Sequence, residues 1–167
     1  LLIVGDTTMA QIKPLLEQRW AGWKAPAEAK PLKNLATVTL PSKPRVYLIN
    51  RTGSEQSLIL AAEVAPPRND PDHLAMVTVN TALGGNFVSR MNMNLREDKH
   101  WAYGAFTVLS NAKGQRPFFV YAPVQTDKTA ESMQEALKEL RNLLGPQPLS
   151  ADEIKFAKDS IVLSLPG

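Results

Sequence analysis

The sequence contains no cysteine and only two histidines among its 167 residues. The lack of cysteine excludes disulfide bonds, thiolate metal ligands and a cysteine nucleophile. His73 and His100 lie far apart in the sequence, and neither belongs to a paired motif that places two zinc ligands on one helix face. We therefore expect no metal site in this chain and interpret both histidines as surface residues.

Long apolar runs and a dense cationic patch are also missing. Residues 58–62 form one of the longest apolar stretches, which ends at a charge far short of the roughly 18 residues that a membrane helix requires. The net charge is +3, and the basic excess is scattered through residues 1–50. Nucleic-acid binding usually needs a concentrated basic face. We expect no membrane span and no nucleic-acid partner.

Several common catalytic and cofactor motifs are incomplete. Gly84-Gly85 lacks the third glycine of a dinucleotide fingerprint and the lysine of a phosphate loop, so it predicts a helix C-cap. Ser89 lies outside a G-x-S-x-G elbow and is better explained as a helix cap. The glutamates within residues 131–139 are predicted on the solvent-facing side of a helix.

The composition, 44% hydrophobic and 21% charged, is typical of a folded domain with a packed core. Apolar spacing and capping residues predict five helices, at residues 9–23, 70–84, 87–97 and 128–144 and onward from residue 150. We expect a kink at Pro14 in the first helix and Asp70 as the N-cap of the second. Ser150 and Glu153 form a capping box at the start of the last. In the third of these helices, Phe87, Met91 and Leu95 form the apolar stripe.

Runs of β-branched and aliphatic residues predict six strands, at residues 1–4, 35–40, 45–50, 57–64, 104–110 and 117–124. We expect 45–50 and 57–64 to pair antiparallel, and 104–110 and 117–124 to form a second hairpin. Hairpins that alternate with helix pairs predict an α+β fold, with a largely antiparallel sheet covered on one face by helices.

The most distinctive segment reads LGGNFVSRM and, three residues later, LREDKHWAYG, within residues 83–104. A glycine-rich turn, Ser-Arg, Leu-Arg-Glu and then Ala-Tyr resembles the insulinase-like (pitrilysin, or inverzincin) zinc metallopeptidases, specifically the domain that follows the zinc-bearing one. The spacing of seven between Arg96 and Tyr103 matches the arginine and tyrosine pair of that family. The resemblance extends from Val4-Gly5-Asp6 to Ser164-Leu165-Pro166-Gly167, and departs from the family at His100-Trp101 and Met91.

The resemblance implies a LuxS/insulinase-like metalloenzyme domain within a two-domain clamshell. A sister domain or subunit then holds zinc through H-x-x-E-H and a distal glutamate, while this domain closes over an unfolded peptide. Residues 1–167 are accordingly expected to be a single α+β domain, an excerpt of a larger peptidase that is inactive by itself. Bacterial members of the family suggest the periplasm as the compartment.

The resemblance also implies roles for two residues. Arg96 binds a backbone carbonyl of the extended substrate, and Tyr103 both binds substrate and acts catalytically by donating a hydrogen bond toward the scissile carbonyl. A guanidinium and a phenol are donors suited to an oxygen that gains negative charge.

Alternatives remain for the residues and for the whole chain. Arg96 could instead pair with Glu97 or Asp98 or cap the C-terminus of its helix, and Tyr103 could simply begin a strand. The chain could be a non-catalytic structural relative, like the core proteins of respiratory complexes, or a binding module unrelated to proteolysis.

Overall fold

The structure is a computed structural model that describes residues 1–165, and the chain forms two compact units that divide after Asn34. The first unit contains the helix α1 (Met9–Arg19), which begins at a capping box. Thr8 Oγ1 accepts a hydrogen bond from the Gln11 backbone N–H at 3.3 Å, and the Gln11 side chain accepts one from the Thr8 N–H at 3.1 Å. The predicted helix is confirmed, although it ends at Arg19 rather than near residue 23.

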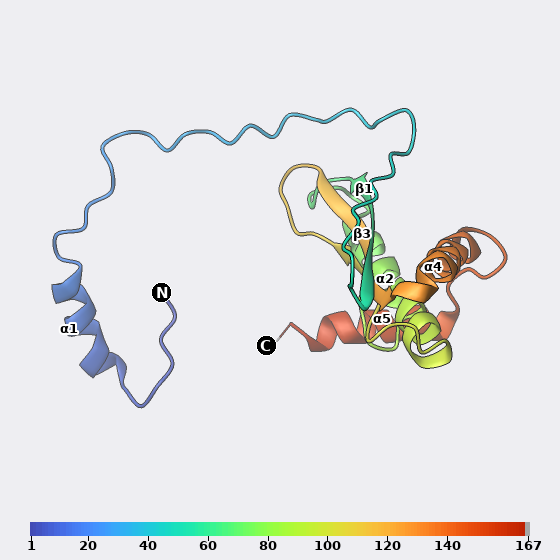
Figure 1. Ribbon diagram of the computed structural model, residues 1–167. Coiled ribbons are helices and arrows are strands. Elements are labelled where there is room, and N and C mark those ends of the chain that lie inside the picture. The colour runs from blue at the N-terminus through green and yellow to red at the C-terminus, as the bar shows by residue number, and fades with distance from the viewer. Residues whose placement is uncertain (166–167) are drawn as a thin grey trace. The chain divides into compact units, whose positions relative to one another are not determined.

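The second unit begins at Leu35 and is built on a three-stranded antiparallel sheet (Figure 1). Its strands are β1 (Gln56–Ala65), β2 (Phe106–Leu109) and β3 (Arg116–Gln125), in the order β1-β3-β2. The predicted hairpin of β2 and β3 is confirmed, with Phe106 opposite Tyr121. The central strand β3 also pairs along the whole length of β1.

Three predicted strands are wrong, because the described segments 1–4, 35–40 and 45–50 belong to no strand. The expected pairing of 45–50 with 57–64 is wrong as well, since β3 takes up the ladder with β1. A high β-propensity produces a strand only where a neighbouring backbone supplies hydrogen bonds, and propensity does not specify that neighbour.

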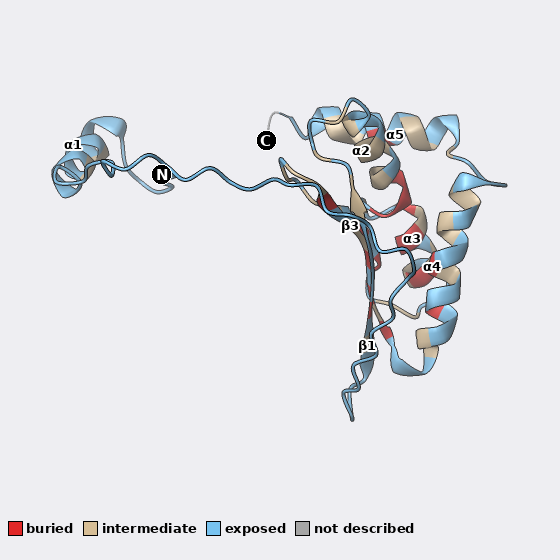
Figure 2. Cartoon of the chain, turned by 90° about the horizontal axis from the view of Figure 1, so that it is seen from above, coloured by how far each residue is buried: buried red, intermediate tan, exposed pale blue. Residues whose placement is uncertain are grey.

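Helices cover one face of this sheet, as Figure 2 shows, and the predicted α+β class is confirmed. The helical elements are α2 (His73–Leu83), α3 (Arg90–Asn92), the π-helix η1 (Met93–Asp98), the 3₁₀ turn η2 (Thr126–Lys128), α4 (Thr129–Leu144) and α5 (Ala151–Leu163). None of the helices described within residues 1–165 has the length and apolar character needed to span a bilayer.

The core lies between the sheet and these helices. Val120, Ala122 and Val124 alternate along β3 and are buried, while the intervening Tyr121 is exposed on the other face. Met91 and Leu95, from α3 and η1, complete the same buried cluster. The helical segment that follows the glycine pair is therefore anchored to the sheet by its own apolar stripe.

The helix ends agree with the sequence pattern in part. Ser150 and Glu153 form the expected capping box of α5. Gly84 is the C-cap of α2, as predicted, but α2 begins at His73 with Asp72 as N-cap rather than at Asp70. The Asp70 carboxylate instead accepts a hydrogen bond from the Asp72 N–H at 2.9 Å, which holds a turn ahead of the helix. Pro166 and Gly167 lie outside the described residues.

Candidate functional site

Arg96 lies in η1, the π-helical continuation of α3. Leu95 precedes it and is fully buried, whereas the Arg96 side chain is partly exposed. The sequence predicted one continuous α-helix over residues 87–97, but only Arg90–Asn92 is α-helical before the π-helical turn begins. π-Helical turns are rare, but those that occur are often found at functional sites, because the extra residue redirects the side chains that follow it.

A tight turn joins Arg96 to Tyr103 and winds around the carbonyl of Leu95. That carbonyl oxygen accepts hydrogen bonds from the N–H groups of Trp101 at 3.0 Å and Ala102 at 3.2 Å. The last residue of β3, Gln125, donates its own N–H to the Trp101 carbonyl at 2.8 Å. The turn is therefore fixed both to η1 and to the end of the central strand.

His100 occupies the strained position of this turn, with φ at 57°. This left-handed conformation favours glycine, although histidine adopts it more readily than most residues do. The exposed His100 ring lies 3.1 Å, through Nδ1, from the Arg96 carbonyl oxygen. The departure from the family pattern at this position is thus accommodated without opening the turn.

The structure brings Arg96 and Tyr103 together. The Arg96 guanidinium carbon lies 5.2 Å from the centre of the Tyr103 ring and 4.5 Å from the centre of the Phe87 ring. Both distances are within the range of a cation–π contact. Tyr103 is 83% exposed, so its hydroxyl is open to a ligand.

The Arg96 guanidinium also contacts Glu97, with Nε 3.3 Å from Oε1. The sequence left this pairing open as an alternative to a substrate-binding role, and the structure contains the pairing. Within residues 1–165 the terminal nitrogens of Arg96 make no hydrogen bond, so these donors remain available at the surface.

Phe87 is the site residue that sequence reasoning missed. It was placed on the apolar stripe of the helix with Met91 and Leu95, which are both buried. Phe87 instead precedes α3, is 53% exposed and stacks on Arg96. Only its position two residues after Gly85 hinted that it lies outside the helix.

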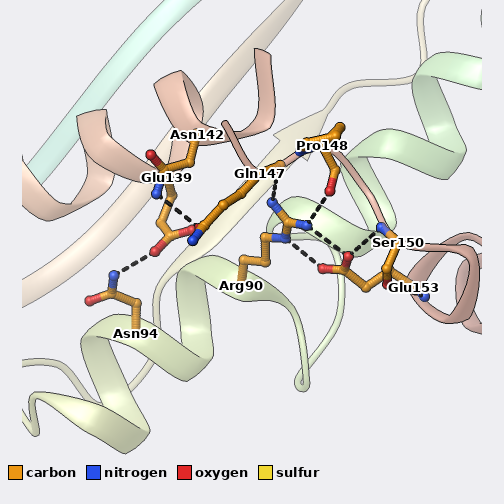
Figure 3. A network of polar contacts seen from close by, with 8 residues as sticks. All are labelled: Arg90, Asn94, Glu139, Asn142, Gln147, Pro148, Ser150 and Glu153. Carbon is orange, nitrogen blue, oxygen red and sulfur yellow. Dashed lines mark hydrogen bonds and ion pairs between the residues drawn. The ribbon is translucent and has the colours of Figure 1, made fainter. Parts of the chain in front are cut away.

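Arg90 of the Ser-Arg motif has a structural role, shown in Figure 3. It forms a bidentate ion pair with Glu153, through Nε at 2.5 Å and Nη2 at 2.7 Å. The same guanidinium donates to the backbone carbonyls of Gln147 and Pro148. The Arg90 hydrogen bonds lower the pKa of Glu153 to about 2, and Glu153 in turn raises the pKa of Arg90. This cluster ties α3 to the start of α5.

The glutamates of α4 are not all on a solvent-facing side, which corrects the prediction for residues 131–139. The Asn94 amide donates hydrogen bonds to Glu135 at 2.9 Å and to Glu139 at 2.6 Å, and the second is drawn in Figure 3. The bond from Asn94 lowers the pKa of Glu135, with a smaller contribution from Lys138. These carboxylates hold η1 against α4.

The histidines do not form a metal site. His73 is only partly exposed, and its Nδ1 accepts a hydrogen bond from Arg116 Nη2 at 3.0 Å. The Arg116 side chain is 2% exposed and also donates to the Pro66 carbonyl at 2.8 Å. Within the described part of the chain no three His, Asp or Glu residues gather as metal ligands, so these residues do not fit zinc.

Ser89 stands at the N-cap position of α3, as the sequence predicted. Its hydroxyl, however, makes no capping hydrogen bond and is buried without a partner among residues 1–165. With only 2% of its surface exposed, Ser89 is unsuited to act as a nucleophile.

Curated relatives of this chain are named as zinc proteases. An uncharacterized zinc protease of Streptomyces coelicolor is 31% identical over 150 residues, which are 89% of this chain and 32% of that protein. Another, of Mycobacterium leprae, is 26% identical over 113 residues, covering 68% of this chain and 25% of that protein. The chain thus spans about a third or less of the length of these relatives.

Solved structures share the fold. A peptidase M16 inactive domain from Pseudomonas fluorescens superimposes with a TM-score of 0.64 at 22% identity, covering 68% of this chain and 28% of that one. A protease from Helicobacter pylori gives a TM-score of 0.67 at 19% identity, covering 96% and 40%. The family model described as the peptidase M16 inactive domain matches residues 1–161. This protein therefore belongs to the peptidase M16 inactive-domain family.

Proposed function

We propose that this chain is the non-metal half of a zinc metalloendopeptidase clamshell, which binds extended peptide and helps to stabilise the tetrahedral intermediate of hydrolysis. The observation that carries the proposal is the pairing of Arg96 with Tyr103, whose ring centre lies 5.2 Å from the guanidinium carbon. The family match and the names of the relatives support the peptidase context. The partner is then a zinc-bearing sister domain or subunit.

Each member of the pair has a distinct chemical task. Arg96 carries a permanent positive charge, and its unused terminal N–H groups suit a backbone carbonyl of an extended substrate. Tyr103 supplies a neutral hydroxyl, which can donate to the scissile carbonyl oxygen as that oxygen becomes negative. Zinc held by the sister domain would activate the attacking water and polarise the carbonyl.

The test is cleavage of an unstructured peptide by the complete protease carrying Tyr103→Phe. The ring and its stacking are kept while the donor is lost, so kcat should fall roughly 100-fold. The melting temperature should be unchanged, because the Tyr103 side chain is largely exposed. Tyr121→Phe, on the exposed face of β3, is the matched control and should retain full kcat.

Arg96→Ala tests the other half of the proposal. Removing the guanidinium should raise KM for the peptide more than it lowers kcat, since a carbonyl contact remote from the reacting bond is made in both the ground and transition states. Normal kinetics in both variants would refute the assigned roles. Absence of chelator-sensitive cleavage by the folded, assembled wild type would favour a non-catalytic relative.

A further inference from the structure

Phe87 and Tyr103 contact the same guanidinium from two segments that are separated by α3 and η1. The ring of Phe87 lies nearer to the Arg96 guanidinium carbon, at 4.5 Å, than the ring of Tyr103, at 5.2 Å. A phenylalanine that is half exposed just before a helix contributes little to a core. Its contact with Arg96 gives this exposed aromatic a specific partner.

The backbone that carries Phe87 is fixed to the backbone that carries Tyr103 through one buried side chain. Asn92 is fully buried, and its Nδ2 donates to the Phe87 carbonyl at 2.7 Å. Its Oδ1 accepts from the N–H of Ala105 at 3.0 Å. Ala105 lies two residues after Tyr103, so the Asn92 amide joins both aromatic segments across the helical turn.

This arrangement limits how Arg96 can move. An arginine side chain has several rotatable bonds, and the cost of ordering it reduces the binding energy that it contributes. A ring stacked on the guanidinium restrains those rotations while it leaves the N–H edge free for a carbonyl. The Phe87 ring thus adds a restraint on Arg96 to those from Glu97 and Tyr103.

We propose that Phe87 is a positioning residue that holds the Arg96 guanidinium beside Tyr103, with Asn92 keeping the two aromatic segments in register. The inference rests on the proposed function, because it takes Arg96 to bind a substrate carbonyl. Phe87 itself touches no reacting atom. It acts through Arg96, so its effect should depend on the presence of that side chain.

The experiment uses the complete zinc protease and an unstructured peptide substrate. Phe87→Leu keeps an apolar side chain but loses the ring face, and KM should rise about 3- to 10-fold while kcat stays within about 2-fold. Phe87→Tyr restores the ring and should return KM to the wild-type value. The neighbouring Val88→Ala, at a site 54% exposed, is the matched control and should leave KM unchanged.

The double variant separates positioning from a merely structural effect. In an Arg96→Ala background, Phe87→Leu should not raise KM further, because the side chain through which it acts is gone. Two outcomes would refute the positioning role of Phe87 and leave the proposed role of Arg96 intact. One is an equal rise in KM in both backgrounds, and the other is a wild-type KM in Phe87→Leu while Arg96→Ala has a raised KM. A wild-type KM in Arg96→Ala refutes the proposed function and this inference together.

Discussion

Three arginines of the second unit have the same guanidinium but different surroundings. Arg90 is neutralised by a bidentate carboxylate, and Arg116 is buried against carbonyls and a histidine. Arg96 stacks on aromatic rings, and within the described residues its terminal nitrogens make no hydrogen bond. A guanidinium whose donors are already satisfied stabilises the fold, whereas one with free donors can recognise a ligand. Of these three arginines, Arg96 is therefore the one whose surroundings suit the binding of a ligand.

The ion pair of Arg90 and Glu153 predicts a pH-dependent contribution to stability. The folded-state pKa of Glu153 is about 2, below its ordinary value of 4.5, so the carboxylate stabilises the fold fully above about pH 5. Glu153→Gln should lower the free energy of unfolding by about 1–2 kcal/mol at pH 7, allowing for solvent screening. The difference from wild type should shrink as the pH falls from about 4.5 to about 2, as measured by urea unfolding.

Glu131→Gln is the control for this experiment. Glu131 pairs with Lys128 at 3.8 Å on the exposed side of α4, so its removal should change the free energy of unfolding by less than about 0.5 kcal/mol. If Glu153→Gln and Glu131→Gln have equal effects at pH 7, the ion pair of Arg90 and Glu153 is not a significant source of stability.

At the scale of elements, α2 and β2 meet at a point that only glycine allows. A Cβ atom on Gly84 would lie 2.4 Å from the backbone nitrogen of Thr107, and that nitrogen donates to the Gly84 carbonyl at 3.0 Å. The backbone angle φ of Gly84 is −163°, which any residue can adopt. Close approach of the strand, rather than helix capping alone, therefore requires glycine here.

Gly84→Ala should accordingly destabilise the protein by about 1–3 kcal/mol, because the methyl group forces α2 and β2 apart. Gly22→Ala is the matched control, since nothing lies within 4 Å of the added Cβ there. Thermal and urea unfolding would measure both variants. Equal stability of Gly84→Ala and wild type would mean that this contact relaxes without cost.

At the scale of the whole molecule, the proposal assigns zinc to the sister domain or subunit, so residues 1–167 should bind no stoichiometric zinc. The two histidines are separated in the fold, one bonded to Arg116 and the other in the turn after η1. Metal analysis after dialysis against trace zinc should find far less than one zinc per chain, in contrast to the complete protease. Tight zinc binding that is lost in His73→Ala or His100→Ala would contradict the assignment of zinc to the partner.

The sequence by itself determined the features that depend on neighbours along the chain. The capping box at Ser150, the ends of α4 and the hairpin of β2 and β3 all follow local patterns, because their hydrogen bonds close over a few residues or a short turn. The Arg96 and Tyr103 pair was expected from the resemblance to the family motif, and one short turn joins the two residues.

Only the tertiary structure decided what depends on contacts between distant segments. β3 pairs with β1 while residues 45–50 stay outside the sheet, Asn94 reaches the glutamates of α4, and Arg116 takes His73 as a partner. The position of Phe87 over Arg96 belongs to this class as well. Apolar periodicity shows which face of a helix or strand is apolar, but the fold as a whole decides which partner that face contacts.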